Sequence, residues 1–127
     1  MLQAKAGLDA LRQSKGCIVW TSSGAAAKAY KSWNAYGSSK AALNAISEHI
    51  AVEEPDITSL AISPGRVNTD MQGILRSEGE DTMDRAQWDT FNEDYKNGKL
   101  LEPEQPGHVM ARFVISPQKD LSGKHVK

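Results

Sequence analysis

A tyrosine, a lysine and a serine in the first third of the chain have the spacing of a proton-transfer site. Tyr36 and Lys40 stand four positions apart, and Ser23 lies thirteen residues before the tyrosine. Residues four apart on a helix share a face, with Cβ atoms about 6 Å apart, so an ammonium there acts on a phenol. A free phenol titrates near pH 10, and a neighbouring cation favours the phenolate. Because a serine hydroxyl both donates and accepts, the three residues together suit carbonyl reduction or alcohol oxidation.

The elements that must position these residues are a short strand, a loop and a long helix. Residues 17–20 form an apolar run after a glycine, which predicts a strand buried on both faces, with Ser23 at its polar end. The neighbouring Ser22 is the alternative candidate, and we interpret it as a strand-end hydrogen-bonding residue. Residues 24–34 are predicted to be a pocket-lining loop. The proline-free run from Ala35 to Val52 has helical periodicity and predicts the helix that carries Tyr36 and Lys40.

The second half of the chain predicts another strand, a binding loop, a lid and a last helix. Residues 57–63 form an apolar run that Pro64 and Gly65 end sharply, and a predicted binding loop follows to Thr69. Residues 72–98 are polar with spaced aromatic residues and predict one or two short helices over a pocket. A helix is predicted to begin at residues 103–104, with a buried side made by Val109, Met110, Phe113, Val114 and Ile115. Residues 121–126 lead into a last strand. We interpret the aromatic residues Tyr30, Trp33, Trp88 and Phe91 as packing residues, not substrate contacts.

This alternation of strands and helices predicts an α/β fold. We expect about three parallel strands, joined by right-handed crossovers and covered by helices, in a single domain over residues 1–127. Ligands bind outside the carboxyl ends of the strands in such sheets. Ser23 and the loop from Pro64 to Thr69 both follow strand ends, so we expect them at one site.

Composition narrows the classes of partner. The net charge is −1 and 24% of the residues are charged, so the basic excess that a nucleic acid partner requires is missing. Neither a signal-peptide core nor a run that could span a bilayer is found, and we expect a cytoplasmic protein with no membrane partner. The single cysteine, Cys17, is interpreted as a small buried hydrophobic residue. The three histidines show no metal-ligand spacing, so no metal is predicted.

These motifs resemble the short-chain dehydrogenase/reductase family, and the ending Leu121-Ser-Gly-Lys is similar to fungal members. The resemblance implies a partial Rossmann-like domain that uses NAD or NADP. It implies that Ser23 orients the substrate carbonyl, that Tyr36 transfers the proton, and that Lys40 makes the tyrosine more acidic and binds the nicotinamide ribose. The cofactor-binding residues that it implies are Tyr36, Lys40, Pro64, Gly65, Val67 and Thr69.

The departure from the family pattern concerns its first half. The glycine-rich turn for the pyrophosphate has no counterpart, because the closest glycines, Gly73 and Gly79, are six residues apart. The residue that chooses between NAD and NADP and the asparagine of the proton relay have no counterpart either. The chain therefore resembles the C-terminal part of a family member, without the dinucleotide-binding βαβ half.

Two functional hypotheses follow. The first is NAD(P)-dependent reduction of a small-molecule carbonyl, or oxidation of an alcohol, with this chain inactive when alone. The second is a catalytically inactive fragment that associates with partners through an uncovered edge of the sheet. A homodimer through the helix from Ala35 to Val52 is also expected.

Overall fold

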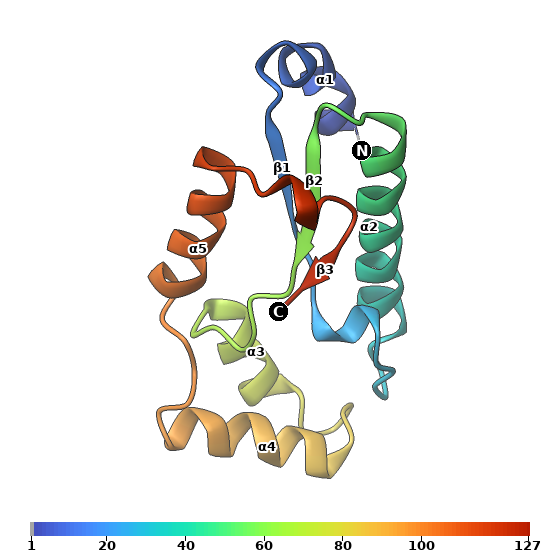
Figure 1. The fold of residues 1–127 in the computed structure, drawn as a ribbon. Coiled ribbons are helices and arrows are strands. Elements are labelled where there is room, and N and C mark those ends of the chain that lie inside the picture. The colour runs from blue at the N-terminus through green and yellow to red at the C-terminus, as the bar shows by residue number, and fades with distance from the viewer. Residues whose placement is uncertain (1) are drawn as a thin grey trace.

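The computed structural model describes residues 2–127, which form an α/β fold (Figure 1). In chain order the elements are α1 (Leu2–Ser14), β1 (Cys17–Thr21), the 3-10 turn η1 (Gly24–Ala26), α2 (Asn34–Glu53), β2 (Thr58–Ile62), α3 (Asp70–Glu78), α4 (Arg85–Lys96), α5 (Glu104–Ile115), the 3-10 turn η2 (Lys119–Leu121) and β3 (His125–Val126). The long helix predicted from residue 35 to residue 52 begins and ends one residue outside those bounds. The predicted lid is two helices, α3 and α4.

The three strands form one parallel sheet in the order β1-β2-β3. The first pair runs in register from Cys17 opposite Thr58 to Thr21 opposite Ile62, and β3 pairs with the end of β2. The prediction of a parallel sheet of about three strands is confirmed. Because the strands are parallel and aligned, the residues that follow β1 and β2 leave the sheet at the same end, the carboxyl end of the strands.

The sheet lies between two helices, with α2 over one face and α5 over the other (Figure 1). The central strand β2 is buried along its whole length, with Leu60 fully enclosed. Between α2 and the sheet, Ser47 and Ser59 are both buried and their hydroxyls lie 3.2 Å apart. The indole Nε1 of Trp20 donates to the same Ser59 hydroxyl at 3.0 Å. Small side chains that satisfy one another let α2 lie close to the sheet without leaving buried polar groups unpaired.

The edge strand β1 and helix α5 are more exposed than the sequence predicts. Residues 17–20 are half-buried, whereas burial on both faces was predicted. Along α5, Val109, Val114 and Ile115 are exposed, with Ile115 82% accessible, although they were predicted to form its buried side. The physical reason is topological: within residues 2–127, β1 has a strand on one side only, and α5 packs mainly against β1.

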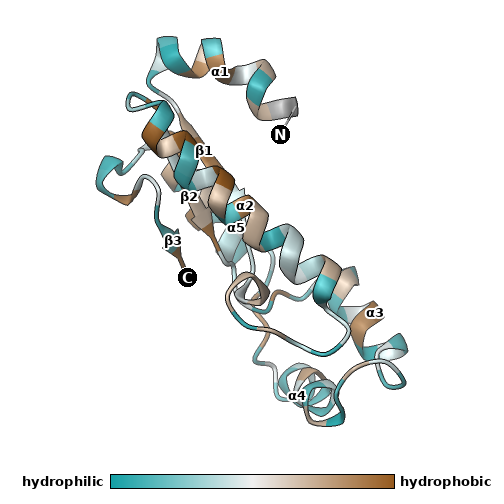
Figure 2. Cartoon of the chain, turned by 90° about the vertical axis from the view of Figure 1, so that its right-hand side faces the viewer, coloured by the Kyte–Doolittle hydropathy of each residue, from teal (hydrophilic) through white to brown (hydrophobic). Residues whose placement is uncertain are grey.

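Helices α3 and α4 lie beyond the carboxyl ends of the strands (Figure 1). Figure 2 shows α2 running lengthwise over the sheet while α3 and α4 stand past its lower end. The two helices are joined to each other by the indole of Trp88, whose Nε1 donates to the carbonyl of Arg76 at 3.1 Å. Met83 and Phe91 are each only 5% exposed. The segment from α3 to α4 therefore buries apolar side chains, although it lies beyond the sheet.

Candidate active site

Three consecutive polar residues, Thr21, Ser22 and Ser23, lie where β1 ends, at the same end of the sheet as the last residue of β2. The backbone N–H of Ser22 continues the ladder by donating to the carbonyl of Ile62 at 2.7 Å. Its side chain is buried and its Oγ donates to Oδ1 of Asn44 at 2.5 Å. This confirms the interpretation of Ser22 as a strand-end hydrogen-bonding residue. Ser23 follows in an extended conformation and caps η1, where its Oγ accepts from the N–H of Ala25 at 3.2 Å.

Helix α2 holds Lys40 and Tyr36 on one face, one turn apart. The ammonium of Lys40 lies 5.7 Å from the centroid of the Tyr36 ring. The same ammonium donates to the carbonyl of Thr21 at 2.8 Å, so the lysine joins the helix to the last residue of β1. A cation held at this point is both close to the phenol ring and fixed relative to the strand that leads to Ser23.

The first turn of α2 and the turn that follows Ser23 are in close contact. A Cβ placed on Gly37 would lie 2.9 Å from the carbonyl oxygen of Ala25, closer than real Cβ atoms approach backbone. Only glycine lets the helix come this near to η1. The contact brings the turn that begins with Ser23 and the helical turn that carries Tyr36 together at the sheet edge.

The loop from Pro64 to Thr69 follows β2 at the same end of the sheet as Ser23 follows β1. Gly65 has a φ of 82°, a conformation that favours glycine. Val67 forms a parallel bridge with Leu101, and Thr69 is the N-cap of α3. The loop is therefore hydrogen-bonded to the segment before α5, and helix α3 begins directly after it.

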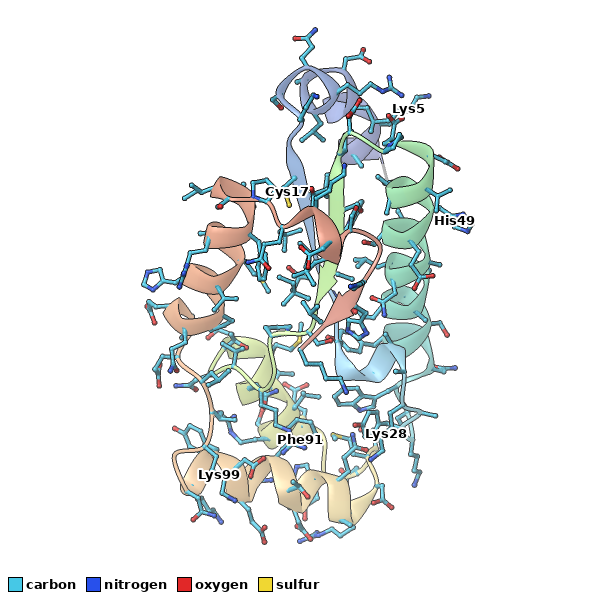
Figure 3. The ribbon with its side chains drawn as sticks, in the orientation of Figure 1. Lys5, Cys17, Lys28, His49, Phe91 and Lys99 are labelled. Atoms are coloured by element: carbon cyan, nitrogen blue, oxygen red, sulfur yellow. The ribbon has the colours of Figure 1, made fainter. Side chains whose placement is uncertain are left out.

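An aromatic cluster lies beside Tyr36 and was interpreted from the sequence as packing. The ring of Trp33 contacts Tyr30, Tyr36 and Phe91, with centroids 5.4, 5.5 and 5.8 Å apart respectively. Phe91 comes from α4 and lies below α2 in the view of Figure 3. The lid therefore packs against the residues around Tyr36 through stacked rings.

Arg66 was not singled out in the sequence, although it ties the loop to the lid. Its guanidinium lies 4.5 Å from the centroid of the Phe91 ring and forms an ion pair with Asp94 of α4. Asn44 of α2 and His125 of β3 were missed as well. Nδ2 of the asparagine lies 3.4 Å from Nδ1 of the histidine, but the two residues are 81 positions apart and no motif joins them. Within the described residues, no group of three metal-ligating side chains lies together, and no helix is long and apolar enough to cross a membrane.

The family assignment follows from comparison with known proteins. A sequence model described as short chain dehydrogenase matches residues 1–80. The chain belongs to the short-chain dehydrogenase/reductase family. It is 40% identical over 116 residues to the benzil reductase ((S)-benzoin forming) IRC24 of Saccharomyces cerevisiae, and 32% identical over 124 residues to sepiapterin reductase of Mus musculus. These alignments cover 88% and 94% of this chain.

Solved structures of this family share the fold. The KRED1-Pglu enzyme superposes with a TM-score of 0.94 at 41% identity, over 97% of this chain and 52% of that enzyme. The two curated relatives are covered over 44% and 45% of their lengths. The chain thus spans about half the length of the relatives that it matches.

Proposed function

We propose that this chain supplies the proton-transfer half of an NAD(P)-dependent oxidoreductase that reduces a carbonyl or oxidises an alcohol. The observation that carries the proposal is the position of Lys40, whose ammonium lies beside the Tyr36 ring and donates to the strand end that leads to Ser23. Family membership supports an oxidoreductase activity.

In the direction of reduction, Tyr36 gives its phenolic proton to the carbonyl oxygen of the substrate. The Oγ of Ser23 already accepts the N–H of Ala25, so its hydroxyl hydrogen remains for a donor contact to the same oxygen. Lys40 stabilises the phenolate that remains after transfer. In the direction of oxidation the same groups act in reverse, with Tyr36 accepting the proton of the alcohol. Such acid–base assistance typically contributes about two to four orders of magnitude in rate.

The residues present fit one part of a nicotinamide cofactor. Lys40 uses one of its three N–H donors on the carbonyl of Thr21, which leaves two for ribose hydroxyls. The left-handed turn at Gly65 lets the backbone of the loop from Pro64 to Thr69, including Val67, approach a planar ring closely. The cofactor, when bound, supplies or accepts the hydride. Binding of its pyrophosphate requires a glycine-rich turn that the sequence of this chain does not contain.

The relatives' names suggest the class of substrate. One is a benzil reductase, and benzil is a diketone that carries aryl groups. Here the ring of Trp33 meets that of Tyr36 edge to face, so an aromatic surface lies next to the proposed proton donor. Aryl ketones therefore form the first panel of substrates to test, with pterin ketones second because another relative is a sepiapterin reductase.

The decisive experiment is titration of the purified chain with NADH and NADPH, followed by fluorescence, and then an assay of aryl ketone reduction. Because this chain lacks the glycine-rich turn for the pyrophosphate, turnover is assayed with a separately produced N-terminal half of a relative added. In that complex Tyr36→Phe should lower turnover at least about a hundredfold while cofactor affinity stays nearly unchanged. Tyr95→Phe is the matched control, because Tyr95 is an exposed tyrosine of α4. Full turnover in Tyr36→Phe would remove the tyrosine from the mechanism.

A second function, association through the free edge of the sheet, is favoured by the exposure of β1 and α5. Within the described residues, β1 has no strand on its outer side. On α5, which packs against β1, Val109, Phe113 and Ile115 line a hollow of about 460 Å³, together with Arg112, Ser116 and Gln118. An unpaired strand edge next to exposed apolar side chains invites another chain to add a strand.

Addition of a separately produced N-terminal half of the KRED1-Pglu enzyme distinguishes the two functions. A stable complex that binds NADPH and reduces aryl ketones supports the oxidoreductase. Self-association of this chain by light scattering, without saturable binding of either dinucleotide, supports a non-catalytic association module. The same measurement reports whether a homodimer forms, whichever surface joins the two copies.

A further inference from the structure

A network of hydrogen bonds between side chains lies at the carboxyl end of the sheet, beside the proposed active site. Ser22, directly after β1, donates through Oγ to Oδ1 of Asn44 on α2 at 2.5 Å. Nδ2 of Asn44 lies 3.4 Å from Nδ1 of His125 on β3. Nε2 of the same imidazole lies 2.7 Å from Oγ of Ser63, directly after β2. Four side chains thus connect the ends of all three strands to α2.

The donors and acceptors of this hydrogen-bond network favour one tautomer of His125. The amide nitrogen of Asn44 can only donate, so the tautomer that fits its 3.4 Å contact is the one in which Nδ1 of His125 carries no proton. In that tautomer Nε2 carries the ring proton and can donate it to Oγ of Ser63. Ser22 is 2% exposed and Ser63 is 7% exposed, so water has little access to these two outer members of the hydrogen-bond network. This network is satisfied with the neutral Nε2–H tautomer.

The network lies one helical turn from the proposed catalytic lysine. Asn44 follows Lys40 by four residues, so both side chains project from one face of α2. Lys40 donates a hydrogen bond to the carbonyl of Thr21, and Asn44 accepts one from the hydroxyl of Ser22. Thr21 and Ser22 are the two residues that directly precede Ser23. The two contacts together fix the axial position and the rotation of α2 relative to the end of β1.

We propose that Asn44 and His125 are positioning residues, which hold the helix of Tyr36 and Lys40 in register with Ser23 through the Nε2–H tautomer of His125. The contribution to catalysis rests on the proposed function, whereas the tautomer and the helix register do not. A displacement of about 1 Å at a reacting group can lower a rate about a hundredfold. No substrate contact is assigned to either residue.

The tautomer is tested on the purified chain by long-range ¹H–¹⁵N correlation of the imidazole groups. His125→Gln assigns the signals, and the exposed His49 (Figure 3) and His108 serve as internal references. On the high-pH plateau, where the ring is neutral, His125 should show a protonated Nε2. Asn44→Asp replaces the amide donor by an acceptor and should move the ring proton to Nδ1. Failure of Asn44→Asp to change the tautomer would overturn the proposal.

The register is tested by amide hydrogen exchange at the strand ends. Asn44→Ala should speed exchange of the Ser22 and Ser63 amides about tenfold, because both N–H groups complete the ladder beside the network. Asn92→Ala is the matched control, since Asn92 is a half-buried asparagine whose side chain bonds only within α4. Equal exchange in the two variants would refute the positioning role.

A kinetic comparison separates this proposal from the proposed function. Where the chain, alone or with the added half, reduces a ketone, Asn44→Ala should lower kcat about ten- to a hundredfold with little change in KM. Asn44→Asp, which keeps an acceptor for Ser22, should recover part of that loss. Absence of turnover in the unsubstituted protein would refute the proposed function. The tautomer and hydrogen-exchange results would then test the positioning role of Asn44 and His125 by themselves.

Discussion

The close approach of α2 to η1 allows a sharp test of the site geometry by Gly37→Ala. The new Cβ would lie 2.9 Å from the carbonyl oxygen of Ala25, and a backbone atom cannot swing away as a flexible side chain can. Overpacking of this kind costs about 1 to 3 kcal/mol. The higher helix propensity of alanine offsets about 0.8 to 1 kcal/mol of that. We therefore expect the free energy of unfolding to fall by about 0 to 2 kcal/mol.

The chain contains two matched controls for this substitution. Gly37, Gly73 and Gly107 are each the fourth residue of their helix, in α2, α3 and α5 respectively. A Cβ on Gly73 or Gly107 would meet no atom within 4 Å. Alanine at either position should therefore stabilise the protein by about 0.5 to 1 kcal/mol. The difference between Gly37→Ala and Gly73→Ala, about 1 to 3 kcal/mol, isolates the clash.

Urea unfolding followed by tryptophan fluorescence and by circular dichroism measures these differences. With an expected shift of about 3 to 5 °C per kcal/mol for a chain of this size, thermal unfolding gives an independent reading. Displacement of the helical turn next to Tyr36 should also lower turnover of Gly37→Ala, whereas Gly73→Ala should retain the packing of η1. If Gly37→Ala were as stable as Gly73→Ala, the inferred contact between α2 and the Ser23 turn would be wrong.

Three further predictions concern the rest of the molecule. Arg12 of α1 hydrogen-bonds Glu54 at 2.8 Å, and this pairing lowers the pKa of Glu54. The stabilisation is present above the ordinary glutamate pKa and is lost as pH falls through the lowered pKa of Glu54. Glu54→Gln should therefore lower the urea midpoint at pH 7, and the difference from the unsubstituted protein should shrink as the pH falls through that lowered pKa. Burial raises the pKa of the Cys17 thiol, so a thiol reagent should label it more slowly at pH 8 than it labels free cysteine, and equal rates would contradict this. Phe91→Ala should lower the free energy of unfolding by about 3 kcal/mol and expose Trp33, seen as a red shift in emission, because Phe91 is buried against that indole.

The sequence alone determined the local parts of this protein. Spacing of four predicted that Tyr36 and Lys40 share a helical face, and the structure places the ammonium 5.7 Å from the ring centroid. Apolar runs predicted the two long strands, and Pro64 with Gly65 predicted the turn after β2. Such features depend on the conformational preferences of a few adjacent residues, which is why periodicity and turn chemistry reveal them.

Only the tertiary structure decided which distant groups meet and which surfaces stay open. Asn44 and His125 are 81 positions apart, and their contact depends on β3 pairing with the end of β2. The exposure of α5 was mispredicted because an apolar helical face signals burial without saying which element covers it. Burial and long-range hydrogen bonds are properties of the assembled layers, whereas a sequence pattern reports the preference of each element by itself.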